Sequence, residues 1–197
     1  DTSFSLAGAP SGQNLFLMFS TATPTVTNGR IEEVSIIATG KDPANQSTGV
    51  NITTGDTVNT SQAGGPTTFG TNSQMITEQE GIRFSFVTGA RANVTIPNLD
   101  QNEADLESNI DFTSYFGARS GTFDVVQLQG GKSAQILISA INNQEGIGNG
   151  FIDSYGNDAS QRVTITNVTV YTTGSSTPLF SATGSGTFGA INVIGGF

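Results

Sequence analysis

The chain has 197 residues and a formal net charge of −9 at pH 7, with seven basic residues, sixteen acidic residues, no histidine and no cysteine. We do not expect nucleic-acid binding, because phosphate contacts need clustered lysines and arginines. The absence of cysteine and histidine excludes disulfides, thiol nucleophiles, imidazole bases and the usual zinc or copper ligation. Any metal would be bound by Asp, Glu, Asn and backbone oxygens, the ligand set suited to calcium.

Short apolar runs separated by turn residues predict an all-β fold. Runs rich in Val, Ile, Phe and Thr alternate with clusters of Gly, Asn, Ser and Pro, as in strands joined by turns, and no helical stripe of apolar residues accompanies them. About ten such strands predict an antiparallel β-sandwich with long calcium-binding loops, and the length fits a single module over residues 1–197. In chain order the expected strands are 14–20, 31–39, 49–54, 81–88, 92–97, 122–128, 133–141, 161–172, 179–183 and 186–194.

Two of these strands have patterns that predict more than their existence. In 81–88, Ile82, Phe84 and Phe86 alternate with more polar positions, so we expect these three side chains to face the core and their neighbours to face solvent. In a later strand the apolar alternation slips by one residue at Asn167. A β-bulge at that position would restore the buried face.

Two long stretches between the strands lack a strand pattern. Residues 55–74 are polar and contain several Gly and Pro, and we expect a loop there; loops longer than about twelve residues are usually functional or disordered. Residues 142–161 hold acidic and amide side chains among glycines, whose freedom to adopt positive φ lets a loop fold around an ion. The candidate calcium ligands in this second loop are Glu145, Asp153, Asn157 and Asp158.

The stretch DQNEADLESNID, residues 100–111, holds five carboxylates and no lysine or arginine. Unit charges about 6 Å apart repel by about 0.7 kcal/mol even in water, so this stretch is either a solvated turn, with a short helix in EADLES, or a cation site. Its spacing lacks the central glycine of helix-loop-helix calcium sites. The candidate calcium ligands in it are Asp100, Asn102, Glu103, Asp105, Glu107 and Asp111.

Three stretches together carry a family resemblance: EQEGIRFSFVTGA (78–90), GTFDVVQLQGGKSAQILISAIN (121–142) and GFIDSYGNDASQRVTITNVTVY (150–171). Their succession resembles the peptide-binding domains near the outer end of long bacterial RTX adhesins. The resemblance implies a calcium-laden β-sandwich, a monomeric module of a larger secreted protein at the bacterial surface. It also implies adhesion through an extended peptide end, with a bound calcium helping to hold the terminal carboxylate.

The ligand-binding residues follow from the needs of a terminal carboxylate. In a chain with few basic side chains an incompletely ligated calcium is the most available positive centre, and Arg83 or Arg91 are alternatives for bidentate capture. Tyr115, Tyr155 and Phe116 are candidates for aromatic surface facing the ligand. The alternative interpretation of each of these aromatic residues is partial burial in the core.

Four other functions are alternatives to peptide binding. A calcium-dependent lectin would use the same oxygen-rich loops for sugar hydroxyls, and the sequence does not separate it from a peptide binder. A structural extender is disfavoured by a length above that of an immunoglobulin-like sandwich, and an ice-binding face by the single Thr-rich strand. An enzyme is not expected. A glycosidase needs paired carboxylates, and the chain has enough of these, but it has no tryptophan for sugar stacking. Without an apolar run of about eighteen residues, we expect no membrane insertion.

Overall fold

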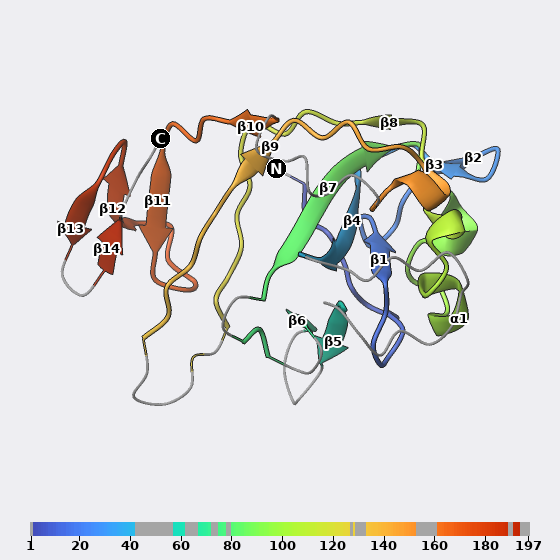
Figure 1. The fold of residues 1–197 in the computed structure, drawn as a ribbon, viewed down its shortest axis with the longest axis horizontal. Helices are drawn as coiled ribbons and strands as arrows, with labels where there is room; N and C mark the ends of the chain where they lie inside the picture. Colours follow the sequence, from blue (N-terminus) through green and yellow to red (C-terminus); the bar gives the residue numbers. More distant parts are fainter. Residues whose placement is uncertain are drawn as a thin grey trace. The chain divides into compact units, whose positions relative to one another are not determined.

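The computed structural model describes residues 2–41, 57–61, 67–71, 75–77, 80–126, 128, 133–152, 161–188 and 191–193 (Figure 1). The fold is all-β, as predicted, with very little helix. The chain divides into two compact units: residues 1–119 with 143–157, and residues 120–142 with 158–197. The described residues form one four-stranded sheet and several two-stranded sheets. The two-sheet sandwich and the single module therefore stay predictions.

The first unit is built around the four-stranded sheet. Its strands are β1 (Phe16–Phe19), β4 (Ser35–Gly40), β7 (Ile82–Thr88) and β8 (Ser114–Tyr115). They lie in the order β1-β4-β7-β8, and every neighbouring pair is antiparallel. The sheet is thus a meander in chain order, and each connection between its strands carries an insertion (Figure 1).

The first two insertions are hairpins. The hairpin of β2 (Val26–Thr27) and β3 (Arg30–Ile31) interrupts the connection from β1 to β4, and β5 (Asn59–Ser61) pairs with β6 (Thr68–Gly70) between β4 and β7. The expectation that 55–74 contains no strand is therefore wrong. The signal was hidden because these two strands are mostly polar and take their place through backbone pairing, which polar residues make as well as apolar ones.

The third insertion is helical and lies between β7 and β8. It contains the 3₁₀ turns η1 (Ala92–Val94) and η2 (Glu107–Asn109) and the single-turn helix α1 (Gln101–Ala104). The predicted strand 92–97 is wrong. Thr95 Oγ1 donates to Arg91 O at 2.9 Å, so a local side-chain hydrogen bond competes with strand pairing, and the β-branched pattern alone did not reveal it.

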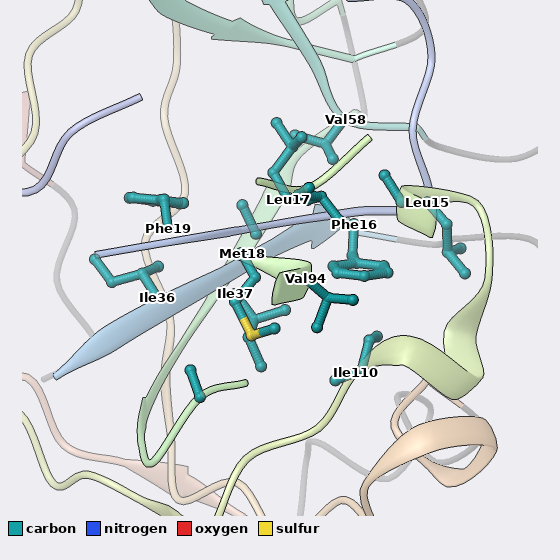
Figure 2. Packing of buried hydrophobic residues seen from close by; sticks show 14 of the residues in the cluster. Leu15, Phe16, Leu17, Met18, Phe19, Ile36, Ile37, Val58, Val94 and Ile110 are labelled. Carbon is teal, nitrogen blue, oxygen red and sulfur yellow. The ribbon is translucent and has the colours of Figure 1, made fainter. Parts of the chain in front are cut away.

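The core lies on both faces of the four-stranded sheet. Every residue of β1 and β4 is buried, and because successive side chains point to opposite faces, both faces must be covered. Figure 2 shows Phe16 directed toward Val94 and Ile110 on one side, and Leu17 beside Val58 on the other. The helical insertion and the β5–β6 region therefore cover opposite faces of the same sheet.

The predicted orientation of β7 is correct only in part. Ile82 and Phe86 pack against the core as expected, but Phe84 is 41% exposed. The most buried residues of the strand are Ser85 and Val87, at 5% and 0% exposure, on the face expected to be solvated. The face that carries Val87 is the more completely covered one. The opposite face is covered in part by aromatic rings, with Phe84 packing edge-on against Phe69 at a centroid distance of 5.4 Å. Alternation located the two faces of the strand, but which face has the deeper cover depends on the insertions.

The described part of the second unit contains three two-stranded antiparallel sheets. The strand pairs are β9 (Ala140–Ile141) with β10 (Arg162–Val163), β11 (Val168–Tyr171) with β12 (Pro178–Ala182), and β13 (Gly186–Phe188) with β14 (Ile191–Val193). The predicted strand 179–183 is confirmed by β12. The predicted strand 186–194 is instead the hairpin of β13 and β14, and 161–172 is split into β10 and β11.

Two strongly apolar predictions in this unit are wrong. The described part of 122–128 contains no strand, and only the last two residues of 133–141 form one. Leu137, in the second run, is 90% exposed. A β-branched run forms a strand only where another backbone pairs with it, and within the described residues only Ala140–Ile141 of these two runs have such a partner, in β10. The register irregularity of β11 falls between Val170 and Tyr171 rather than at Asn167. The predicted strand 49–54 lies outside the described residues.

A glycine at the end of β7 offers a sharp test of this packing. Gly89 has φ of +69°, and a Cβ atom added to it would lie 2.7 Å from Thr113 Cβ; Gly29 has φ of +76° and open space around it among the described residues. We expect Gly29→Ala to cost about 1 kcal/mol from backbone strain alone. Gly89→Ala should cost about 1–3 kcal/mol more, the typical penalty for overpacking. Chemical denaturation of both variants measures the difference, and equal losses would contradict the close approach to Thr113.

Candidate acidic site

Two loops whose sequences are rich in acidic residues lie against each other in the first unit. Ile152 N donates to Glu107 Oε1 at 2.9 Å, and Gly148 N, in the 3₁₀ turn η3 (Gly148–Gly150), donates to Ile110 O at 2.7 Å. The rings of Phe112 and Phe151 pack edge to face with centroids 6.0 Å apart. We call this contact of residues 105–112 with residues 145–152 the acidic junction.

The first carboxylates of the 100–111 stretch serve to begin a helix. Asp100 Oδ1 accepts a hydrogen bond from Glu103 N at 2.8 Å, and Glu103 Oε2 accepts one from Asp100 N at 3.1 Å. This reciprocal capping box satisfies two backbone donors at the start of α1. A short helix is confirmed in this stretch, but it spans Gln101–Ala104 instead of EADLES (103–108), and the expected solvated turn is wrong for Asp105 and Glu107, which are buried. Asn102 lies on the same helix and is exposed.

Asp105 is a buried carboxyl group at the end of α1. Asp105 is only 2% exposed, and its Oδ1 has no hydrogen-bond partner within the described part of the chain. Burial raises the pKa of Asp105, and a hydrogen bond from the backbone of Leu15 opposes this in part. An ionised carboxylate in such surroundings is costly unless a cation or further donors stabilise it.

The raised pKa of Asp105 predicts a pH dependence of stability. A raised pKa in the folded state means that folding favours the protonated carboxyl, so its stabilising contribution is complete below the unfolded pKa of about 3.9 and is lost as pH rises through the folded value. In a metal-free buffer we expect Asp105→Asn to match or exceed the wild type at pH 7, by at most about 1 kcal/mol because its amide donors also need partners. Urea unfolding across pH measures this. The wild type should gain on the variant as pH falls, and the opposite slope would contradict the assignment.

Glu145, in the acidic junction, is buried and forms an ion pair with Arg83 of β7. Glu145 Oε1 lies 3.9 Å from Arg83 Nη2, and the two side chains are 2% and 10% exposed. Tyr115 OH donates to Glu145 O at 3.1 Å, and its ring packs edge-on against Phe112 with centroids 5.0 Å apart. Burial and the nearby Glu145 carboxylate raise the pKa of the Tyr115 hydroxyl, and Arg83 opposes the rise. The ligand-binding role predicted for Arg83 and Tyr115 stays a prediction, and Phe116, beside them, is exposed.

Asp111 has basic partners that its sequence neighbours did not reveal. Arg30 Nη2 donates to both of its carboxylate oxygens, at 3.1 and 3.2 Å, and Arg91 Nη1 lies 3.8 Å from Oδ2. Arg30 is 81 residues away in sequence, and no local pattern points to it. Sequence reasoning therefore missed Arg30 as a residue of this region.

The remaining candidate ligands lie outside the described residues, namely Asp153, Tyr155, Asn157 and Asp158. Within the described part of the chain, no three acidic side chains gather into a group that could hold a metal ion. A calcium site at the acidic junction would therefore need ligands from residues beyond Ile152. The predicted calcium ligands stay predictions.

Comparison with known proteins assigns no family to this chain. No protein-family model matches it, and no characterised protein or solved structure is similar to it beyond chance. No helix in the part of the chain that the structure describes has the length and apolar character needed to cross a bilayer.

Proposed function

We propose that the chain is a calcium-dependent ligand-binding module of a bacterial surface adhesin, which recognises the carboxylate end of an extended peptide on other cells or surfaces. The observation that supports it most is the acidic junction. There the backbone of Ile152 is bonded to the buried carboxylate of Glu107 at 2.9 Å. The next residue in sequence is Asp153, so the candidate ligands of the second loop other than Glu145 begin directly after this hydrogen bond.

The burial of carboxylates favours a cation at the junction. Asp105, Glu107 and Glu145 are 2%, 1% and 6% exposed. Arg83 is the basic side chain paired with Glu145, and in a chain of net charge −9 few others are available. Calcium takes about six to eight oxygen ligands in flexible geometry. Carboxylates of the junction together with Asp153 and Asn157, which belong to the same unit, supply such a set in this proposal.

Peptide-end recognition is supported by the resemblance to the adhesin domains and by the available chemistry. A terminal carboxylate bound at a positive centre gains a charge-assisted contact, which is about twice as strong as a neutral hydrogen bond. Backbone contacts with an extended chain add affinity that does not depend on sequence. In this proposal the module is extracellular and is a binding domain without enzymatic activity.

Calcium titration by isothermal calorimetry tests the metal part of the proposal. We expect saturable binding with a dissociation constant no weaker than about 10⁻³ M, the upper range for extracellular modules. Asp124→Asn is the matched control, because Asp124 is an exposed carboxylate outside both acidic loops. It should bind calcium as the wild type does. A wild-type protein that shows no calcium heat at millimolar concentration would overturn the proposal.

A binding panel separates the two classes of ligand. Immobilised protein in calcium is presented with peptides carrying free C-termini and with a set of glycans. Peptide binding that calcium chelation abolishes supports the proposal. Binding restricted to glycans would replace it with the calcium-dependent lectin.

A further inference from the structure

Two arginines face each other next to the turn of the β2–β3 hairpin. Arg30 and Arg91 are direct partners in an isolated antiparallel β-bridge. The backbone hydrogen bonds of their neighbours, each 2.9 Å long, flank the pair, so it is a non-hydrogen-bonded pair, in which side chains approach most closely. Like charges directly opposite each other destabilise a sheet. An anion near both guanidinium groups would remove that cost.

The chain itself supplies one anion for these two cations. Arg30 Nη2 donates to both oxygens of Asp111, at 3.1 and 3.2 Å, and Arg30 Nη1 donates to Gly89 O at 2.7 Å. Arg91 Nη1 lies 3.8 Å from Asp111 Oδ2, which is beyond hydrogen-bond distance. Asp111 therefore pairs mainly with Arg30. The two arginines and this aspartate together carry a net charge of +1.

Among the described residues, the guanidinium group of Arg91 makes a hydrogen bond through Nε only. Its Nε donates to Asn93 Oδ1 at 2.9 Å, which orients the guanidinium plane. Within the described part of the chain, neither Nη atom of Arg91 donates a hydrogen bond. The side chain is 40% exposed. A guanidinium oriented in advance, with free donors in a fixed fork, suits the two oxygens of a carboxylate.

The arginine pair lies in a surface depression. It is open to solvent and has a volume of about 800 Å³. Besides the two arginines, its lining includes Asn28, Asn93 and Asn98. Asn93 Oδ1 accepts the hydrogen bond from Arg91 Nε, and Asn98 Nδ2 donates to Ala92 O, so each of these two amides keeps its other group for a ligand. Amide side chains both donate and accept hydrogen bonds, so they match the N–H and C=O groups of a peptide backbone next to a terminal carboxylate.

We propose that this depression, which we call the arginine site, binds the terminal carboxylate of the peptide ligand through Arg91, with Arg30 as the second cation. The inference rests on the proposed function for the peptide nature of the ligand, and it adds the place where the peptide end is held. In this arrangement calcium acts on the acidic junction and its loops, and the carboxylate contact itself is made by guanidinium.

The charge of the site selects a monoanion. One excess positive charge matches one carboxylate, whereas a phosphate or sulfate dianion would meet the field of a chain of net charge −9 with only half of its charge compensated. An acidic side chain within a peptide has the same carboxylate chemistry as a C-terminus. The test therefore includes peptides of both kinds.

The experiment follows the arginine Nε–H signals of the full chain by NMR while peptides are added in calcium. The probes are Ac-Ala-Ala-Ala with a free C-terminus, the same peptide amidated, and Ac-Ala-Asp-Ala amide. The variants are Arg91→Gln, Asp111→Asn and, as the control, Arg119→Gln, an exposed arginine outside the depression. Melting curves of every variant identify any loss of fold.

For the wild type and Arg119→Gln we expect the acid peptide to bind at least about tenfold more tightly than its amide, as for one charge-assisted contact. It should also bind more tightly than the Asp peptide, because only at a C-terminus does the carboxylate directly follow the peptide backbone that the asparagines of the lining would contact. Arg91→Gln should reduce this preference to within about twofold, because the guanidinium group that would hold the terminal carboxylate is gone. Asp111→Asn should strengthen acid-peptide binding several-fold, because it removes the internal competitor for Arg30. A purely structural role for the ion pair predicts no such gain, and neither does a role for Asp111 as a calcium ligand.

Several results would overturn the arginine site. They are a preference for the acid peptide that survives Arg91→Gln, tighter binding of the Asp peptide, and weaker binding in a folded Asp111→Asn variant. The two proposals fail separately. If peptide binding needs Arg91 but not calcium, the arginine site stands and the calcium proposal falls. If binding needs calcium but not Arg91, the reverse holds.

Discussion

Removal of calcium is expected to lower the melting temperature of the chain by about 5–10 °C. At about a hundred times its dissociation constant, a ligand that binds only the folded state stabilises it by about 2.7 kcal/mol. For a chain of this size about 1 kcal/mol corresponds to about 2–4 °C. The effect is large because calcium would offset the mutual repulsion and desolvation of the buried carboxylates at the acidic junction.

Differential scanning calorimetry in calcium, and again in excess chelator at matched ionic strength, measures this shift. Magnesium in place of calcium is the control, since it demands a stricter octahedral geometry and gives up its waters reluctantly. Magnesium should restore little of the loss. Identical melting curves with and without chelator would mean that no structural calcium is bound.

Truncation of Glu107 is expected to be the most damaging single change at the acidic junction. Its side chain is buried, at 1% exposure, and accepts the hydrogen bond from Ile152 N at 2.9 Å. Glu107→Ala removes the acceptor, leaves that buried N–H without its bond and opens a cavity, so we expect a loss of about 2–4 kcal/mol. Asp124→Ala, at an exposed position, should change stability by less than about 0.5 kcal/mol.

Glu107→Gln separates the hydrogen bond from the charge. The amide oxygen still accepts from Ile152 N, so in chelator this variant should be close to the wild type or more stable. In calcium it should gain less stability than the wild type, because a charged ligand has been lost. Urea unfolding of both proteins in both buffers gives the comparison. Equal calcium stabilisation of the two would remove Glu107 from the calcium site.

The sequence correctly predicted strands that a local apolar pattern specifies. It failed to predict strands whose formation depends on pairing with a distant backbone segment. The run 14–20 contains β1, and the run 31–39 covers β4 as far as Thr39, because both runs are apolar and their strands are neighbours in the meander. The equally apolar run 133–141 forms only the short strand β9, because strand formation requires a backbone partner that composition does not specify. The polar strand β5 was missed for the same reason, since its place comes from pairing with β6.

The acidic residues show the same division between local and distant information. The capping box of Asp100 and Glu103 is a local pattern, and the short helix was foreseen as one interpretation of the stretch. The bond between Glu107 and Ile152 joins residues 45 positions apart. Because nothing local encodes that contact, the sequence indicated two acidic loops without indicating that they meet. Only the fold makes one candidate site of them.

The most direct test of calcium-dependent recognition of a peptide end is a calorimetric titration of one short peptide in four conditions. The peptide is supplied with a free C-terminus and as its amide, each in calcium and in chelator. We predict binding of the acid form in calcium, a loss of about 2–5 kcal/mol on amidation, as for a desolvated charge contact, and no binding of either form in chelator. Equal binding of the acid and amide forms, or binding that persists without calcium, would contradict calcium-dependent capture of the carboxylate.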